Sequence, residues 1–296
     1  MPTFRPDRFA SVHLFHPLTR CMNRKAAGRI PILMYHAIEN VPSYRSPYYE
    51  TSTSPYMFAR HMKFLSENGY ETVTLEQAIA AFDKPLGERR PIVLTFDDGY
   101  RSVYTNACPI LRAYGFTGTV FLISGLTGDR RMQFREMDCL TWSEAREMQQ
   151  DGMSIGSHTA THPVLAALSR AAIDRELGRS KAEIEDHLGR PVKSFSYPFA
   201  FPEANSRLVS CLAGTLEKYG YENGVSTTIG TAGPGDPRYF LPRLPANTCD
   251  DMRLFQAKLE GAYDWLRYPQ HVYKQLKHRL AGRHHGPSRS EALEAM

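Results

Sequence analysis

The sequence predicts an α/β fold in which parallel strands alternate with helices, as in a (β/α) barrel. Short apolar runs of buried-strand type recur along the chain, separated by segments with helical periodicity. The alternation repeats six or seven times, which indicates parallel βα units. A chain of 296 residues also suits one barrel domain, because barrels of ~250 residues are routine.

The expected strands are apolar runs that stop at turn residues or at polar side chains. The first run is 30–36, a weaker one is 72–75, and a third, 91–96, ends abruptly at Asp97, Asp98 and Gly99. The later runs are 117–123, 153–157, 192–197 and 221–227. Their apolar composition is typical of strands buried on both faces.

The expected helices carry end signals as well as periodicity. Ser54 and Pro55 open the first, which ends at Gly69. Thr141 and Glu144 have the spacing of a capping box before a helix that stops near 152. Other helices are expected at 75–82, from 99 to about 114, at 169–188 and at 203–219.

The chain divides into three parts on this pattern. Residues 1–28 are expected to form an irregular N-terminal arm, and 29–262 hold the alternating domain. Residues 263–296 are expected to form a basic helix and a disordered tail. For the helix, a solvated face and a contact with an anionic membrane or glycan both stay open. Its basic residues are Arg267, Lys274, Lys277, Arg279 and Arg283.

Composition excludes several classes of function. The formal net charge is +5, and the body of the chain has no dense basic block, so a nucleic-acid partner is not expected. The five cysteines are widely spaced and do not predict a disulfide framework. The chain contains no apolar stretch of ~18 residues, so no membrane span is predicted. The first thirty residues show no secretory signal, and this absence and the cysteine pattern both favour a cytoplasmic location. The oligomeric state is not predicted.

Chemically informative side chains stand where the expected strands end. His36 ends the first, Asp97 and Asp98 end the third, His158 ends 153–157, and Tyr197 ends 192–197. In parallel α/β folds, the carboxyl ends of strands and the loops after them build the active site. These residues are therefore expected to meet at one end of the barrel.

Asp97 and Asp98 form a pair of adjacent carboxylates that would be costly to bury without partners. Neighbouring strand residues point in different directions, so one carboxylate can bind a cation while the other faces a reacting water. The residues alone do not say which does which. An exposed Asp-Gly turn also stays open.

His158 and His162 have the spacing i, i+4, which lets both imidazoles face one point if the segment makes a helical turn. Two histidines and one aspartate leave an open fourth position, as in catalytic zinc sites. The same set occurs in non-haem iron oxygenases, which remain an alternative. The 60 residues between Asp98 and His158 argue against it, because those sites usually place the ligands close together in sequence.

Residues 95–100 (TFDDGY) and 157–162 (SHTATH) together resemble the polysaccharide deacetylase family, carbohydrate esterase family 4, also called the NodB-homology domain. Residues 197–199 (YPF) resemble its third motif and 241–243 (LPR) a late element of one branch; the likeness covers about 30–260. It implies a distorted (β/α) barrel of about seven units. It also implies a divalent metal, with zinc expected, held by Asp98, His158 and His162, and Asp97 as catalytic base.

The chain departs from the family pattern at two positions. Many members have Arg two residues before the proline of the third motif, where this chain has Ser196. Arg243 is the candidate for the missing cation, although a surface Arg in a loop stays open. Many members also have a late Leu-x-His that supplies the general acid, which is not found here. His36 is the candidate acid, because it ends the first strand and has an ordinary pKa near neutral pH. A structural histidine at the barrel mouth and an additional metal contact stay open for it.

The resemblance implies a metal-dependent hydrolase that removes N-acetyl groups from an N-acetylglucosamine-type polysaccharide or oligosaccharide and releases acetate. A glycan-binding protein without activity is the alternative, but a binder has no need of the base. Aromatic rings near the expected mouth are candidates for stacking on sugars, and core packing is the other interpretation of each. These substrate-binding candidates are Tyr100, Trp142, Tyr197 and Phe199.

Overall fold

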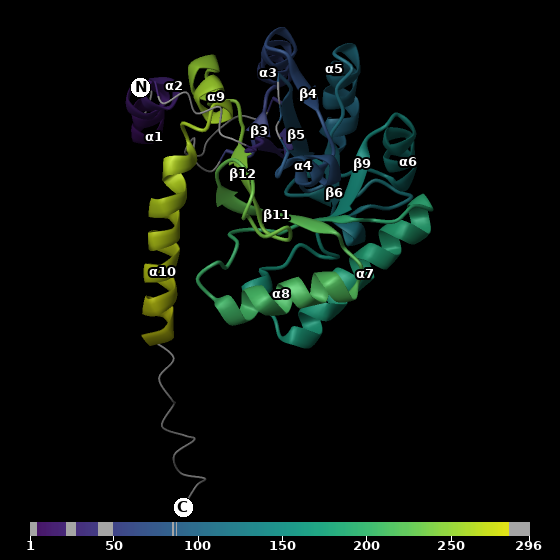
Figure 1. Cartoon of the computed structure of the whole chain (residues 1–296). Coiled ribbons are helices and arrows are strands. Elements are labelled where there is room, and N and C mark those ends of the chain that lie inside the picture. Colours follow the sequence, from purple (N-terminus) through teal and green to yellow (C-terminus); the bar gives the residue numbers. More distant parts are fainter. Residues whose placement is uncertain (1–4, 22–27, 41–49, 85, 87, 284–296) are drawn as a thin grey trace, which may run out of the picture.

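The computed structural model describes residues 5–21, 28–40, 50–84, 86 and 88–283, without the side chains of 277–283. Seven parallel strands of this part of the chain close into a barrel, because β1 pairs with both β12 and β5 (Figure 1). The predicted barrel of about seven units is therefore confirmed. In order around the barrel the strands are β1 (Ile32–Tyr35), β12 (Leu241–Pro245), β11 (Asn223–Ile229), β10 (Ser194–Ser196), β9 (Ser154–Ser157), β6 (Thr119–Leu122) and β5 (Arg90–Phe96).

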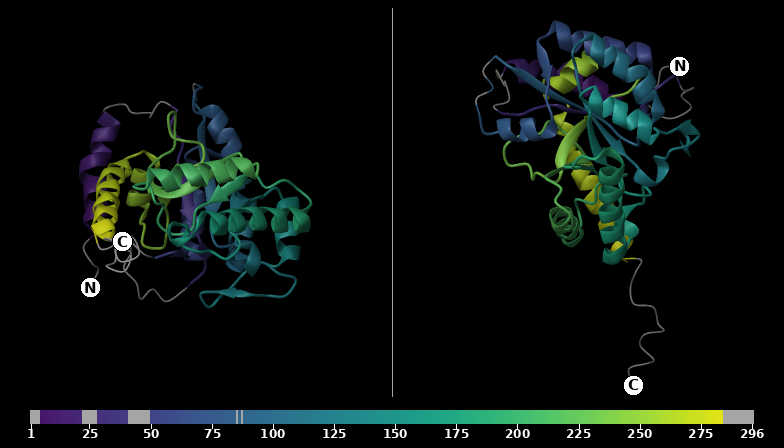
Figure 2. Two further views of the ribbon diagram at one scale, coloured as in Figure 1. Left: turned by 90° about the horizontal axis from the view of Figure 1, so that it is seen from below. Right: turned by 90° about the vertical axis from the view of Figure 1, so that its right-hand side faces the viewer.

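Helices surround the barrel and follow the strands as the sequence pattern predicts (Figure 2). Thr74 and Thr141 make the capping boxes that begin two of them, and Gly189 ends α7 in a left-handed conformation. The short strand β4 (Tyr70–Thr72) pairs with the outer edge of β5. The helices are α3 (Pro55–Glu67), α4 (Leu75–Ala81), α5 (Cys108–Ala113), α6 (Trp142–Gln150), α7 (Arg170–Leu188), α8 (Ser206–Lys218) and α9 (Met252–Leu259).

Side chains alternate between the barrel interior and the helix layer. Val93 and Leu241 belong to a buried apolar cluster formed by several strands and by α4, whereas Leu94 belongs to the larger cluster shared with the other helices. Because strands have a period of two, Thr95 and Arg243 follow Val93 and Leu241 into the interior. The barrel interior is therefore apolar toward the amino ends of the strands and polar near their carboxyl ends.

β12 contains two prolines although it lies between β1 and β11. Pro242 and Pro245 have no N–H to donate, which is why prolines are rare in central strands and why the sequence did not indicate one here. The neighbouring strand β11 is irregular between Val225 and Ile229, opposite this segment. The alternative of a surface loop for Arg243 is therefore excluded by the structure.

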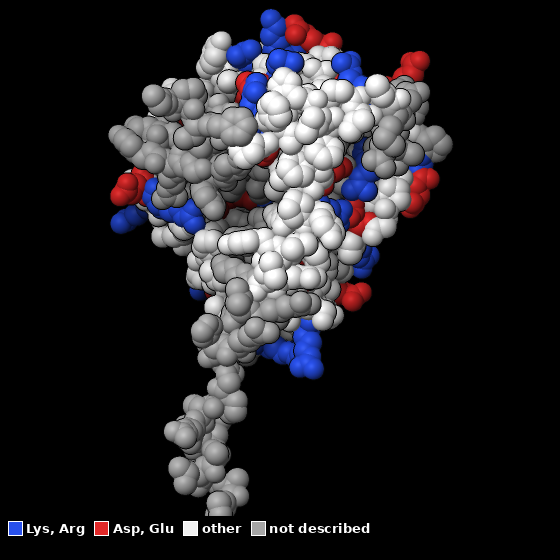
Figure 3. Space-filling model, turned by 90° about the vertical axis from the view of Figure 1, so that its left-hand side faces the viewer, with Lys and Arg blue, Asp and Glu red and all other residues white. Residues whose placement is uncertain are grey.

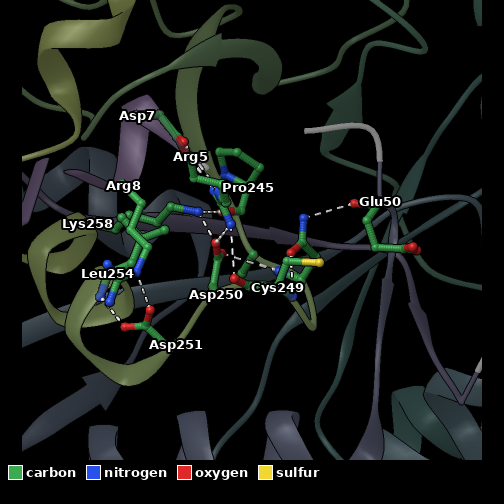
Figure 4. A network of polar contacts seen from close by, with 12 residues as sticks. Arg5, Asp7, Arg8, Glu50, Pro245, Cys249, Asp250, Asp251, Leu254 and Lys258 are labelled. Carbon is green, nitrogen blue, oxygen red and sulfur yellow. Dashed lines mark hydrogen bonds and ion pairs between the residues drawn. The ribbon is translucent and has the colours of Figure 1, made fainter. Parts of the chain in front are cut away.

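The N-terminal arm is helical rather than irregular over residues 6–21, so that prediction is wrong there. It comprises α1 (Pro6–Ala10), a π-helical turn (Ser11–Phe15) and α2 (His16–Cys21). Long-range polar contacts hold it, including Arg5 Nη1 to the Cys249 carbonyl oxygen at 2.9 Å (Figure 4). A sequence pattern does not show contacts made across more than two hundred residues.

The C-terminal segment begins with a short helical turn and continues as α10 (Arg267–Arg283). The predicted basic helix therefore exists as a helix, although the side chains of Lys277, Arg279 and Arg283 lie outside the described part. The predicted tail at 284–296 also lies outside it. Among the described helices, none combines the length and apolar character needed to cross a bilayer.

Candidate active site

Three side chains converge at the carboxyl end of the barrel. One Asp98 carboxylate oxygen lies 3.3 Å from Nε2 of His158 and 3.3 Å from Nε2 of His162. One ligand atom from each residue lies within 4.8 Å of the others, and all three side chains are buried. Two imidazole nitrogens and one carboxylate oxygen are the donor set of a catalytic divalent-metal site with an open position.

His158 is oriented by a neighbouring strand. Its Nδ1 lies 2.7 Å from the backbone carbonyl oxygen of Ser196, the last residue of β10, and donates its hydrogen there. That bond assigns a hydrogen to Nδ1 and leaves Nε2, which lies beside Asp98, as the nitrogen that could bind a metal. A histidine held in this way fits a metal ligand, and the three residues together therefore fit a divalent ion.

The loop from His158 to His162 is not a helical turn, so the predicted geometry is wrong although the two rings do meet. Their centroids lie 4.9 Å apart, and Thr159 and His162 adopt left-handed backbone conformations with φ of 69° and 57°. Glu176 of α7 holds the loop, accepting from Ala160 N at 3.0 Å and Thr161 N at 2.9 Å.

Gly125, in the short 3-10 turn that follows β6, supports the same loop. Its N–H donates to the Ala160 carbonyl oxygen at 2.9 Å, and a Cβ there would lie only 2.6 Å from that oxygen. Any larger residue would push the loop away. The strained conformations near His162 are thus held by contacts from two separate elements, as is common at functional sites.

Asp97 and Arg243 form a buried ion pair across the barrel, as the sequence analysis expected. Nη1 donates to one carboxylate oxygen at 2.8 Å and Nη2 to the other at 2.7 Å. The remaining guanidinium hydrogens reach Thr95, Ser196 and the Ser226 carbonyl oxygen at 3.0 to 3.1 Å. All five donors are therefore used, and the plane of the guanidinium is fixed.

The surroundings of Asp97 favour its ionised form. Burial alone would raise its pKa, but the charges of Arg243 and His158 and the hydrogen bonds from Arg243 outweigh burial and lower it. Ser196 takes part as well, since its hydroxyl donates to Asp97 Oδ1 at 3.0 Å. The sequence analysis treated Ser196 only as the position where an Arg is missing; its small side chain leaves room for Arg243.

His36 lies at the end of β1, half-buried, on the side of the barrel where Asp97 and Asp98 lie. Burial lowers the pKa of its imidazole, while the charges of Asp98 and Asp97 partly restore it. Because β1 and β5 are parallel and Tyr35 pairs with Phe96, His36 follows its strand level with Asp97, as expected from the strand ends.

The four aromatic candidates separate into two groups. Trp142 is 3% exposed and stacks on His187 at 4.2 Å, and Tyr197 is 1% exposed among Phe195, Phe201 and Phe240. Protein already covers these rings, so the stacking role predicted for Trp142 and Tyr197 is corrected to core packing.

Phe199 and Tyr100 lie beside the candidate metal ligands. Phe199 is 42% exposed, and its ring centroid lies 4.6 Å from that of His162. Tyr100 is buried, and burial together with the Asp98 carboxylate raises the pKa of its hydroxyl. Tyr100 thus contacts the site through Asp98, whereas Phe199 offers a face to a ligand.

A hairpin that the sequence analysis missed closes the other side of the site. Between β7 (Gln133–Phe134) and β8 (Met137–Asp138), Arg135 and Glu136 both have positive φ, as a tight hairpin turn requires. The Phe134 ring lies 5.0 Å from His162, and Arg135 lies over the rings of Phe134 and Phe199 at 5.0 and 5.8 Å. Arg-Glu is not a typical sequence for such a turn, so no local signal marked it.

Comparison with known proteins agrees with this geometry. The family model for polysaccharide deacetylase matches residues 84–217. YxkH of Bacillus subtilis strain 168, which is named for the same family, is 34% identical over 236 residues, covering 79% of this chain and 77% of YxkH. The poly-beta-1,6-N-acetyl-D-glucosamine N-deacetylase of Staphylococcus aureus strain MSSA476 is 25% identical over 203 residues, covering 65% of this chain and 67% of that protein.

Solved structures show the same likeness. The Streptococcus pyogenes deacetylase PplD in complex with acetate matches with a TM-score of 0.67 and 26% identity, covering 78% of this chain and 98% of PplD. The polysaccharide deacetylase BA0330 from Bacillus anthracis matches with 0.64 and 28%, covering 78% and 69%. From the barrel, the polar residues at its strand ends and these relatives together, it follows that this chain is an enzyme of the polysaccharide deacetylase family.

Proposed function

We propose that this deacetylase removes N-acetyl groups from an N-acetylglucosamine-type polysaccharide or oligosaccharide, leaving a free amine and releasing acetate. The likeness to the Staphylococcus aureus enzyme named for poly-beta-1,6-N-acetyl-D-glucosamine supports the substrate class. The observation that carries the proposal is the position of Asp97. It is ion-paired with Arg243 and directly precedes Asp98, which meets His158 and His162.

The proposed cofactor is a divalent metal, with zinc as the first choice, held by Asp98, His158 and His162. Bound there, such an ion would polarise the acetamide carbonyl and lower the pKa of a water molecule toward ~7. The chain itself supplies the proton transfers and the positioning of the substrate.

Asp97 is the proposed general base, and its contacts point to one oxygen. Oδ1 accepts from Arg243 and Ser196, whereas the described contacts of Oδ2 are with Arg243 only. A carboxylate has about four lone-pair positions, so the free one lies on Oδ2. Oδ2 would take the proton of the attacking water while Arg243 and Ser196 keep the carboxylate from turning.

His36 is the proposed general acid, because an amide nitrogen leaves poorly until it is protonated. The test is His36→Ala assayed on an acetamide and on an aryl acetate, whose leaving group needs no proton. Loss of amide cleavage with ester cleavage and metal content retained supports the role. Equal loss on both substrates points to metal binding or folding instead.

Phe199 is the proposed stacking surface for the sugar beside the scissile acetamide, since its ring is partly exposed next to His162. Phe199→Ala is expected to raise KM more than it lowers kcat. The same change at buried Phe201 serves as a packing control, which should lower stability as well.

The proposal as a whole is tested by measuring acetate release from a panel of N-acetylated and O-acetylated sugars, with and without chelator. Acetate and free amine should appear in equal amounts from N-acetylglucosamine oligomers and disappear after chelation. Binding of the oligomers without acetate release would favour a glycan-binding protein. Oxygen consumption with iron would favour an oxygenase.

A further inference from the structure

α10 contacts the barrel with its polar face, which reverses the usual arrangement of a surface helix. Gln270 donates to the Thr227 carbonyl oxygen at 3.0 Å and accepts from Ile229 N at 2.9 Å. Four side chains spaced along one helical face make such contacts with the rest of the protein. They are Arg267 with Asp236, Gln270 with β11, and His271 and Lys274 with Glu203.

The opposite face of α10 is apolar and faces solvent. Tyr268 is 76% exposed, Tyr273 66%, Leu276 54% and Val272 37%. Positions 268, 272 and 276 follow one another at i, i+4 and i+8 and form one stripe, with Tyr273 beside it. A contiguous apolar stripe on a helix that already has its polar contacts marks an interaction surface.

The N-terminal helices extend this surface. Leu14 and Leu18, also spaced i, i+4, are 53% and 56% exposed. Phe15 of the same segment stacks on Trp265 at 5.1 Å, just before α10, and Trp265 donates to Ser11. Figures 1 and 2 place α1, α2 and α10 on the same side of the barrel, and Figure 3 shows uncharged residues across the middle of that side.

The charge of the chain is concentrated in these two segments. Residues 1–28 and 267–283 together carry ten Lys and Arg and one Asp, whereas all other residues carry 26 Lys and Arg against 30 Asp and Glu. The net charge is therefore +9 in these two stretches of sequence and −4 elsewhere. Residues 267–283 contain no acidic residue at all. Five of the ten basic residues already pair with acidic side chains of the protein: Arg5, Arg8, Arg20, Arg267 and Lys274. The positive charge that would complement a negatively charged surface is therefore that of Arg24, Lys25, Lys277, Arg279 and Arg283.

We propose that α10, together with the N-terminal helices, is a peripheral attachment site for an anionic lipid bilayer. Tyrosines beside aliphatic side chains suit the boundary between headgroups and acyl chains, and the basic residues of the same segments suit anionic headgroups. A second copy of this chain fits the charge less well, because two such surfaces would repel each other.

Attachment through α10 would bring the active site close to the bilayer. His271 and Lys274 pair with Glu203, which lies in the loop after β10, the same loop that carries Phe199. A lipid surface on the outer face of α10 would therefore lie beside a loop of the active-site mouth. This orientation favours glycan presented at or near a membrane.

The test measures co-sedimentation of the full-length protein with two kinds of vesicle, phosphatidylcholine alone and phosphatidylcholine mixed with phosphatidylglycerol. Binding should be at least about tenfold stronger to the anionic vesicles and should weaken as salt is raised. The variant Tyr268→Ser, Val272→Ser, Tyr273→Ser, Leu276→Ser should lose at least about tenfold in binding. A matched control changes two exposed apolar residues elsewhere, Tyr56→Ser and Val164→Ser, and should bind like wild type.

Thermal unfolding of both variants establishes that they are folded before binding is compared. Absence of wild-type binding to anionic vesicles, or undiminished binding by the four-residue variant, would overturn the proposal. Sedimentation that shows a dimer in wild type and a monomer in that variant, with no vesicle binding, would assign the face to a second copy instead.

Discussion

The active-site cluster and the polar network near the N-terminus are both buried and charged, yet they differ in how donors and acceptors are matched. The network, which we call the anchor network, comprises Arg5, Asp7, Asp250 and Lys258 (Figure 4), together with Tyr263, whose hydroxyl donates to Asp7. Lys258 donates to Asp250 and to the Pro245 carbonyl oxygen, both at 2.6 Å, and Arg5 also reaches Asp250. Each carboxylate there meets at least one cationic or hydroxyl donor.

In the active site, one group of side chains instead converges on a single point. Asp97 is as fully paired as any residue of the anchor network, whereas one oxygen of Asp98 meets Nε2 of both His158 and His162, so that three potential ligand atoms converge. Such an arrangement is stable only with a cation or a shared proton between the atoms. Burial and charge therefore do not identify the site; the convergence of three potential metal-ligand atoms does.

The largest expected effect is on His158. His158→Ala removes one of three ligands, so we expect loss of the bound ion and a fall in activity of more than about 10³-fold. Elemental analysis and acetate release measure the two quantities. His187→Ala, a histidine that stacks on Trp142 away from the site, should keep both, and equal loss in the two variants would contradict the assignment.

Substitution of Asp97 should lower kcat without changing the metal content. Asp97→Asn keeps the shape of the side chain but removes the basic oxygen, so kcat should fall by ~10²–10⁴ while the metal content stays unchanged. Steady-state kinetics on one N-acetylated oligomer measures this fall. Turnover near that of wild type would show that another group acts as the base.

A substitution in the anchor network should lower the free energy of unfolding without changing kcat. Lys258→Met leaves Asp250 buried with a weaker set of donors, and breaking a buried pair in this way costs ~3–5 kcal/mol of unfolding free energy. Denaturant unfolding measures the loss, while kcat of the folded protein should not change. Lys193→Met breaks an exposed pair with Glu222 and should cost at most ~1 kcal/mol. A fall in kcat for Lys258→Met would mean that the two regions are coupled.

His61 should add a modest pH dependence to stability. Burial lowers the pKa of its imidazole to about 4, from an ordinary value near 6.5. The unfolded chain therefore takes up a proton at higher pH than the folded protein does. Stability is fully present above pH ~6.5 and falls as the pH drops toward about 4, by at most ~3 kcal/mol. In His61→Asn this part of the pH dependence should vanish, and an unchanged slope would assign it to other groups.

The sequence predicted the barrel and the meeting of Asp97, Asp98, His158 and His162 because both follow from local patterns. Strand ends are visible as apolar runs that stop at polar residues, and parallel topology brings those ends together. The pairing of Arg243 with Asp97 was also expected. The strand that carries Arg243 was not expected, because its two prolines argue against a strand.

What the sequence could not show depends on contacts between distant residues. The conformation of 158–162 is held by Glu176 and Gly125, so the i, i+4 spacing wrongly suggested a helical turn. Trp142 and Phe199 look alike as aromatic residues near strand ends, and only packing separates the covered ring from the exposed one. The N-terminal helices depend on contacts near Asp250, which no local pattern records.

The central claim is that two adjacent carboxylates have separate roles, with Asp98 holding a divalent ion and Asp97 acting as the base. The most direct measurement is the metal content of Asp97→Asn compared with Asp98→Asn, purified in parallel and loaded with the same ion. We expect about one ion per chain in Asp97→Asn, with little activity, and a much lower content in Asp98→Asn. Equal metal content in the two variants would contradict the division of roles.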